Sequence, residues 1–350
     1  MYKSLQACRA VAACLVVLFH LGETVSIPKY YGIAGLAYPF SFGHAGVEFF
    51  FVLSGFIIFF IHAKDIGHPG ESKSFALKRA IRIFPSYWLV LFPLLIIGVL
   101  IPGTVAAMPQ DAGVFLKSLF LIPQDSAVVG GTGAPVVAVA WTLQYELVFY
   151  GLFLLAIVHR FFAWLIPLAM IALYFFSWGK SGLPWMLFSD GWMLIFLLGC
   201  VTAWLCRKSC PKSLAIVSAS LGVLGFAASA ATRLAHNGLF TGSHFAFGLS
   251  SALIIYGLVQ LERQGARLSG GRLFQMLGAS SYALYLIHVP VIIVTLRCFR
   301  LIHWNGMAAA LTAATGTFIA CLAASIAFHQ YLEKPIGRFL SRRLLKSSAS

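Results

Sequence analysis

Charged side chains are scarce in this chain of 350 residues: only 10% are Asp, Glu, Lys or Arg, and only 10 of these are acidic. A soluble protein has about 25% charged residues, so this chain has too few to cover a surface in water. Hydrophobic residues make up 60% of the sequence. This composition excludes a soluble globular domain, a disordered chain and a coiled coil, and it indicates a protein of the lipid bilayer.

The sequence also lacks motifs for metal, nucleotide and serine hydrolase chemistry. No HExxH, GxGxxG or GxSxG occurs, and the GKS at 179–181 lacks the upstream glycine of a P-loop. Cys206 and Cys210 have no second pair of ligands nearby, so we expect no metal site. The net charge of +15 is not gathered in a soluble basic patch, so we expect no nucleic-acid partner.

Ten stretches are apolar and long enough to cross a bilayer. They lie at about residues 5–21, 46–61, 83–101, 138–158, 161–176, 187–205, 213–231, 244–260, 281–299 and 307–331. We therefore predict an all-α fold, a polytopic membrane helix bundle with about ten transmembrane helices. Residues 1–340 are predicted to form the membrane domain, and residues 341–350 a short basic and Ser-rich cytoplasmic tail.

Lys and Arg fall mainly on one side of these spans, with eighteen on that side and six on the other. Because cytoplasmic loops retain positive charge, both termini are predicted to be cytoplasmic. The segment 102–137 is the one long outward loop, which we expect to be either a re-entrant segment or a lid on the surface.

The first span carries two ionisable side chains, Arg9 and His20. Such a group within a span costs about 3 kcal/mol or more, so each one marks a candidate functional site. Eleven residues turn an α-helix by about 1100°, so the two side chains share one face, about 16 Å apart along the axis. The alternative is that Arg9 reaches the inner lipid headgroups and His20 lies at the outer interface.

The second span places His44 and Glu48 one helical turn apart at its outer end, where they can touch. His44 has the alternative of a simple loop histidine at the interface. Glu48 is followed directly by FFFVL and therefore needs a partner, for which His20 is the candidate.

The third and fourth spans carry a basic pair and a carboxylate. Arg79 and Arg82 share a helix face, and they are expected either to bind anionic lipid headgroups or to clamp the phosphates of a cytoplasmic donor. Glu146 is bracketed by aromatic side chains that resemble a sugar-facing surface, although a neutral helix contact is the alternative. These aromatic residues are Trp141, Tyr145 and Tyr150.

The ninth span carries Tyr285 and His288, which are three residues apart. A histidine at this depth is either a reactive group or a satisfied helix-packing residue. Glu333, at the inner end of the last span, is expected to be a structural partner for the inner arginines.

The segments RAVAACLVVLFH, GVEFFFVLSGFI, RAIRIFPSYW, WTLQYELVFY, SYALYLIHVP and EKP follow one another in this order. Together they resemble the acyltransferase 3 family of bacterial integral membrane O-acyltransferases, in particular the exopolysaccharide-type acetyltransferases. The resemblance implies an acyl-CoA donor, usually acetyl-CoA, and a carbohydrate hydroxyl as acceptor. The family's functional residues match Arg9 and His20 in the first span, the RxxR pair Arg79 and Arg82, Glu146, His288 and Glu333.

We therefore expect a membrane O-acetyltransferase of the bacterial inner membrane, with lipid, a polysaccharide or lipid-linked glycan, and polysaccharide-assembly proteins as partners. His20 is expected to act as general base or transient acyl carrier, oriented by Glu48 or Glu146, and the arginines to hold the CoA phosphates. The residues assigned to substrate binding or structural support are Trp141, Tyr145, Tyr150, Tyr285, His288 and Glu333. The alternative is a non-enzymatic flippase or permease for a lipid-linked saccharide.

Overall fold

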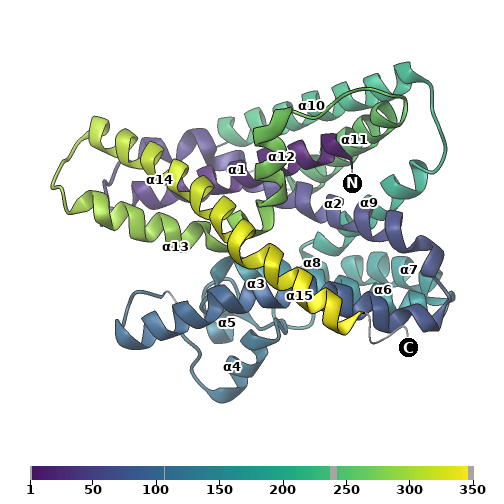
Figure 1. Ribbon diagram of the computed structural model, residues 1–350, viewed down its shortest axis with the longest axis horizontal. Coiled ribbons are helices and arrows are strands. Elements are labelled where there is room, and N and C mark those ends of the chain that lie inside the picture. Colours follow the sequence, from purple (N-terminus) through teal and green to yellow (C-terminus); the bar gives the residue numbers. More distant parts are fainter. Residues whose placement is uncertain (1, 106, 237–242, 346–350) are drawn as a thin grey trace. The chain divides into compact units, whose positions relative to one another are not determined.

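A computed structural model describes residues 2–105, 107–236 and 243–345, and the regular elements in these ranges are all helices (Figure 1). The prediction of an all-α fold is confirmed. The elements are α1 (Lys3–Ser26), η1 (Ala34–Leu36), η2 (Tyr38–His44), α2 (Ala45–His62), η3 (Ala63–Asp65), η4 (Pro69–Glu71), α3 (Ser72–Leu100), α4 (Ala112–Leu119), α5 (Ser126–Val129), η5 (Ala138–Ala140), α6 (Trp141–Val158), α7 (Phe162–Phe176), α8 (Met186–Ser189), α9 (Trp192–Leu205), α10 (Lys212–Ala235), α11 (Ser243–Arg263), α12 (Gly271–Ala279), α13 (Ser281–Arg300), α14 (Met307–Phe328), the π-helical turn η6 (His329–Glu333) and α15 (Lys334–Leu344).

Within the described residues, eight helical segments are long and apolar enough to cross a membrane. Two shorter apolar helices, α7 and α9, correspond to the fifth and sixth predicted spans. The expected ten spans are thus eight long helices and two short ones. The cytoplasmic placement of the termini stays a prediction.

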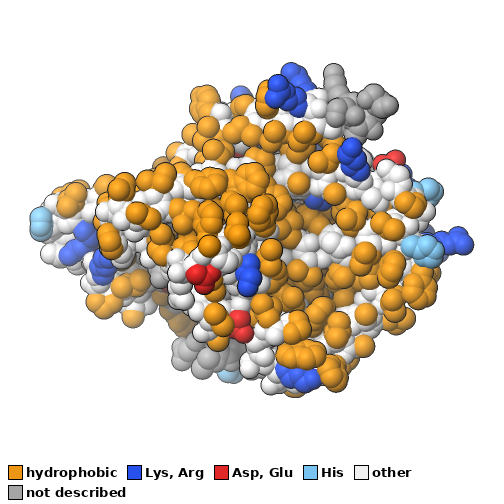
Figure 2. Space-filling model, turned by 90° about the horizontal axis from the view of Figure 1, so that it is seen from below, with side chains coloured by type: hydrophobic (Ala, Val, Ile, Leu, Met, Phe, Trp, Pro, Cys, Tyr) orange, Lys and Arg blue, Asp and Glu red, His pale blue; other side chains and the backbone are white. Residues whose placement is uncertain are grey.

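Large hydrophobic side chains cover much of the surface. Trp164, Leu224 and Ile319 are all more than half exposed, and Figure 2 shows one face on which hydrophobic side chains predominate and charged ones are scattered. An apolar surface of this kind is stable in lipid and not in water. The chain is a multi-pass membrane protein.

The chain folds as two compact units, each built from two segments of the sequence. Unit 1 contains Met1–Ile57 and Leu198–Gln330, and unit 2 contains Ile58–Leu197 and Tyr331–Ser350. Helices α2 and α9 each begin in one unit and end in the other.

Unit 1 is organised around α1, which packs against α12, α13 and α14. Its core is formed by small and branched side chains of α1, α13 and α14, including Val17, Leu284 and Ala313. Helices α13 and α14 lie side by side, as do α10 and α11 (Figure 1). The dense contacts around α1 hold its polar side chains in fixed positions.

Helices α10 and α11 approach closely because glycines lie at their interface. A Cβ atom at Gly222 would lie 2.7 Å from the backbone nitrogen of Ile254, and one at Gly257 would lie 2.6 Å from the backbone nitrogen of Ala219. Small residues allow such close backbone contact between membrane helices.

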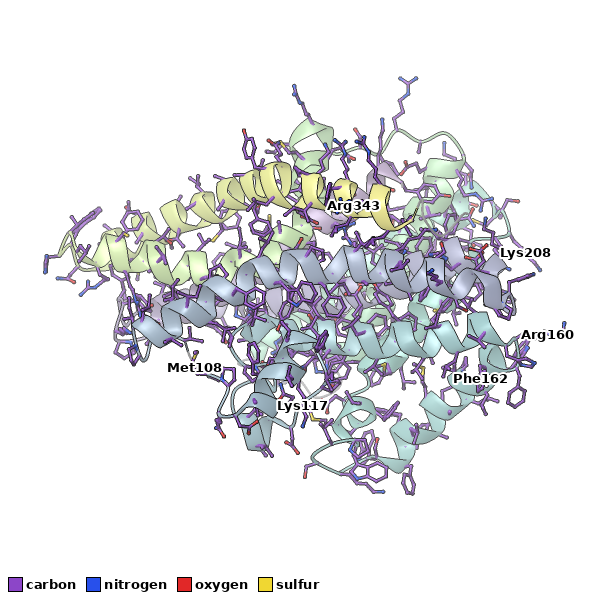
Figure 3. All side chains as sticks on the ribbon, turned by 60° about the horizontal axis from the view of Figure 1, so that its bottom comes forward. Met108, Lys117, Arg160, Phe162, Lys208 and Arg343 are labelled. Atoms are coloured by element: carbon purple, nitrogen blue, oxygen red, sulfur yellow. The ribbon has the colours of Figure 1, made fainter. Side chains whose placement is uncertain are left out.

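Unit 2 contains the long loop that joins α3 to α6. Side chains of both helices bind its backbone: Tyr87 Oη donates to Ser118 O at 2.7 Å, Trp88 Nε1 to Leu119 O at 2.9 Å, and Gln144 Nε2 to Gly133 O at 3.1 Å. The loop contains two short helices, α4 and α5, and Lys117 lies on α4 (Figure 3). It is therefore fastened to α3 and α6 by side-chain hydrogen bonds, and its expected re-entrant or surface arrangement stays a prediction.

Helix α3 begins at Ser72, eleven residues before the predicted span. The predicted start of this span was too late, because the first turns of α3 carry basic residues and hydropathy detects only the apolar part of the helix. Arg79 and Arg82 consequently lie inside a helix.

Helix α15 packs along α3, and Arg343 lies near the C-terminal end of α15 (Figures 1 and 3). The end of the predicted tail, 346–350, lies outside the described residues, and the domain boundary at residue 340 stays a prediction.

We predict that Gly257→Leu destabilises the protein by about 1–3 kcal/mol, because the new side chain forces α10 and α11 apart. The measurement is the midpoint of thermal unfolding in detergent. Gly151→Leu on α6 is the matched control, because a Cβ there meets nothing within 4 Å. Equal unfolding temperatures for the two variants would contradict close α10–α11 packing.

Candidate functional site

In unit 1, the polar side chains of α1 face α13. Arg9 Nε and Nη2 donate to Ser281 Oγ at 3.1 and 2.8 Å. Two turns further along α13, the ring of His288 lies 5.1 Å from the ring of His20, centroid to centroid. Arg9 and His20 therefore share one face of α1, as their spacing predicts, and α1 and α13 run in the same direction.

His288 is completely buried, and its two ring nitrogens differ. Nδ1 lies 3.1 Å from the carbonyl oxygen of Leu284. Because a carbonyl oxygen only accepts, Nδ1 carries the proton and Nε2 presents a lone pair. This Nε2 is buried and has no hydrogen-bond partner among the residues that the structure describes. The ring of Tyr285 lies edge-on to Phe50 and is tilted by 50° against the ring of His288.

The carboxylate beside His20 is Glu23, whose Oε2 lies 3.7 Å from His20 Nδ1. The expected orienting residues, Glu48 and Glu146, bind other side chains. Glu23 lies one turn after His20 on α1, whereas Glu48 lies on α2 and Glu146 on α6. Glu48 is bound to His44 and His244 instead of His20, and an orienting role for Glu146, a residue of unit 2, stays a prediction.

Glu48 is completely buried between two histidines of unit 1. Its Oε1 lies 3.3 Å from His44 Nδ1 and 2.8 Å from His244 Nδ1. The expected contact between His44 and Glu48 is confirmed, whereas the expected partnership of Glu48 with His20 is replaced by His244 of α11. A carboxylate at this depth needs such partners because it is removed from water.

Arg233 is a cation near Glu48, at the end of α10. Its Nη1 donates to Ser243 Oγ at 3.3 Å. Three buried atoms of this cluster have no hydrogen-bond partner among the described residues: Glu48 Oε2, His44 Nε2 and Arg233 Nε. The positive charge of Arg233 favours the ionised form of the Glu48 carboxylate.

In unit 2, the two arginines of α3 have different surroundings. The guanidinium of Arg79 lies 5.7 Å from the ring centroids of both Phe75 and Tyr150. The more exposed Arg82 has its Nη1 3.8 Å from Glu333 Oε1. The expected contact of Glu333 with one of these arginines is present, and its place on the inner side stays a prediction.

The aromatic residues of α6 do not act as one group. Tyr150 donates a short hydrogen bond to Glu146 Oε1, one turn away. Tyr145 Oη instead donates to Met186 O at 3.0 Å, and Trp141 packs against Trp192 with ring centroids 5.2 Å apart. Tyr150 joins Glu146 to Arg79, because its ring also contacts the guanidinium.

Within the described ranges, no group of three His, Cys, Asp or Glu side chains is placed to hold a metal ion. Burial raises the pKa of Cys206 to about 12. The thiol is therefore protonated at neutral pH, and a protonated thiol is a poor metal ligand.

The Acyl_transf_3 family profile, described as an acyltransferase domain, matches residues 2–329. The chain belongs to the acyltransferase 3 family. Membership implies acyltransferase activity. The chain is also 29% identical over 343 residues to the exopolysaccharide production protein ExoZ of Rhizobium meliloti (strain 1021), covering 92% of this chain and 95% of ExoZ. No solved structure matches it.

Several polar residues of this acyltransferase were not assigned from the sequence. Glu23 and Asp65 each lie three residues after a histidine of the same helical segment, and this spacing could have revealed them. His244 lies 196 residues from Glu48, and no local pattern connects the two.

We predict that Glu48→Ala destabilises this acyltransferase by about 3–5 kcal/mol, because His44 and His244 lose their common acceptor in a buried site. Thermal unfolding in detergent measures the effect. Glu23→Ala is the control and is expected to cost less than about 1 kcal/mol, because that pair is largely exposed.

The result also separates a structural from a chemical role for Glu48. A Glu48→Ala protein that unfolds like the wild type but has lost acyl transfer would show that the carboxylate acts in the reaction rather than in the fold.

Proposed function

We propose that this protein is an O-acetyltransferase of the bacterial inner membrane that moves an acetyl group from cytoplasmic acetyl-CoA to a carbohydrate hydroxyl. Membership of the family implies an acyltransferase activity. The similarity to a protein named for exopolysaccharide production supports a polysaccharide or lipid-linked glycan as the acceptor. The observation that carries the proposal is the His20–His288 pair. His20, whose imidazole suits proton transfer or acyl transfer, contacts a buried histidine whose Nε2 has no hydrogen-bond partner among the described residues.

The arginines are proposed to bind the donor. CoA carries phosphate groups, and guanidinium groups bind phosphate through paired hydrogen bonds. Arg79 supports this role because its Nε is a buried donor that has no partner in the described part of the chain, and an anion would satisfy it. Arg82 is proposed to contribute from the same helix. Arg9, fixed by Ser281, is proposed to support donor binding in unit 1.

His20 is proposed to take the proton of the acceptor hydroxyl. The hydroxyl oxygen then bonds to the thioester carbonyl carbon, the carbon–sulfur bond breaks, and the proton passes to the CoA thiolate. In the second route His20 accepts the acyl group first, CoA leaves, and the hydroxyl attacks the acyl-imidazole. Glu23 takes the orienting role in both routes, since its carboxylate is beside His20.

The remaining site residues are proposed to act through their neighbours. Glu48 holds His44 and His244, and Glu146 fixes Tyr150. The side chains proposed to line the acceptor path or to support it are Trp141, Tyr145, Tyr150, Tyr285 and His288, and Glu333 is proposed to position Arg82.

We predict that His20→Ala lowers acetyl transfer by about 10²–10⁴-fold, the usual contribution of a general base. Purified protein in nanodiscs is given radiolabelled acetyl-CoA and exopolysaccharide, and label on the polysaccharide is counted. His68→Ala is the matched control because His68 is an exposed loop histidine, and it is expected to retain activity.

Full activity in His20→Ala would remove His20 from the mechanism. Labelled acetyl found on His20 in the absence of acceptor would select the acyl-enzyme route over direct transfer.

A further inference from the structure

His62, at the end of α2, lies in unit 2 and is almost completely buried. Its Nδ1 is 2.7 Å from Asp65 Oδ2, and its Nε2 is 3.3 Å from Arg79 Nη2. The ring also packs edge-on against Phe75, with centroids 5.0 Å apart. His62 therefore touches the proposed donor-binding arginine directly.

The two contacts fix the tautomer of His62. A guanidinium only donates hydrogen bonds, so Nε2 must accept from Arg79. Nδ1 then carries the ring proton and donates it to Asp65. The other tautomer would turn an N–H group toward the Arg79 cation. Asp65 thus selects the form of His62 that can bind Arg79.

Arg79 is held on several sides. His62 binds Nη2, and the rings of Phe75 and Tyr150 lie next to the guanidinium. Tyr150 is itself fixed by its hydrogen bond to Glu146. The Nε donor of Arg79 is buried, and no described residue accepts its hydrogen bond. An arginine fastened in this way loses little side-chain entropy when it binds a phosphate.

We propose that His62, set by Asp65, is a positioning residue that fixes the Arg79 guanidinium for the phosphates of the acyl-CoA donor. The inference rests on the proposed function, in which Arg79 binds the donor. The donor's phosphate completes the hydrogen bonding of Arg79, while His62 and Asp65 do not touch the donor. Their removal weakens donor binding and leaves the acyl-transfer step itself unchanged.

The test compares wild type with His62→Leu, His62→Gln and Asp65→Asn in nanodiscs, measuring the Kd for acetyl-CoA by calorimetry and the KM and kcat for acetyl transfer. We expect His62→Leu to raise Kd and KM by roughly tenfold or more, because a hydrogen bond to a charged group is lost. We expect kcat at saturating donor to change less than about twofold, as for a residue that acts on donor binding alone.

His62→Gln is the conservative variant, because the amide oxygen replaces Nε2 as acceptor for Arg79. It is expected to recover most of the affinity lost in His62→Leu. The single variant Asp65→Asn is expected to bind acetyl-CoA more weakly than the wild type. The double variant with Asp65→Asn and His62→Leu is expected to bind no more weakly than His62→Leu alone, because Asp65 acts through His62. His68→Leu, at an exposed histidine of the same unit, is the control and is expected to bind like the wild type.

The possible results separate the positioning role of His62 from the proposed function of the protein. If the wild type binds acetyl-CoA and the Kd of His62→Leu is unchanged, the positioning role is wrong and the proposed function stands. If kcat falls while Kd and KM stay constant, His62 acts in the chemical step instead. If the wild type binds no acetyl-CoA, the proposed function fails, and this inference fails with it. Should His62→Leu not fold, the Kd values of His62→Gln and Asp65→Asn decide the question.

Discussion

A polar side chain inside a membrane helix must find its partner within the protein, because lipid offers none. The pairs Arg9–Ser281, Glu48–His244 and Arg79–His62 meet this constraint through contacts between different helices. Each of these contacts fixes the position of a side chain and also sets which of its atoms remain available. The fold and the chemistry of this protein therefore depend on the same small set of hydrogen bonds.

Some polar residues of the motif segments hold the fold together by binding the backbone of another segment. Tyr87 and Trp88 of the PSYW segment and Gln144 of the WTLQ segment donate to backbone carbonyls of the loop between α3 and α6. A preference of aromatic residues for the membrane interface does not explain these hydrogen bonds. Because these side chains have partners in the fold, the proposed reaction is assigned to the histidines, carboxylates and arginines.

Helical periodicity predicted what lies within one helix: the shared face of Arg9 and His20 and the contact of His44 with Glu48. It could not predict His244 or Ser281, because those contacts depend on which helices pack together, and one sequence does not encode this as a local pattern. The start of α3 was misplaced for a related reason: hydropathy detects the apolar part of a helix, and its basic first turns look like a loop.

The buried polar atoms that have no hydrogen-bond partner among the described residues belong both to structural side chains and to residues of the proposed site. Such atoms are rare in folded proteins, because each costs about 1–3 kcal/mol of desolvation. Two of them lie in the proposed site: His288 Nε2 is an acceptor in unit 1, and Arg79 Nε is a donor in unit 2. A lone pair beside His20 suits a reaction that moves a proton, and a guanidinium N–H suits a phosphate. These two atoms therefore fit the two groups that the proposed transfer from acyl-CoA brings to the protein, the transferred proton and the donor phosphate.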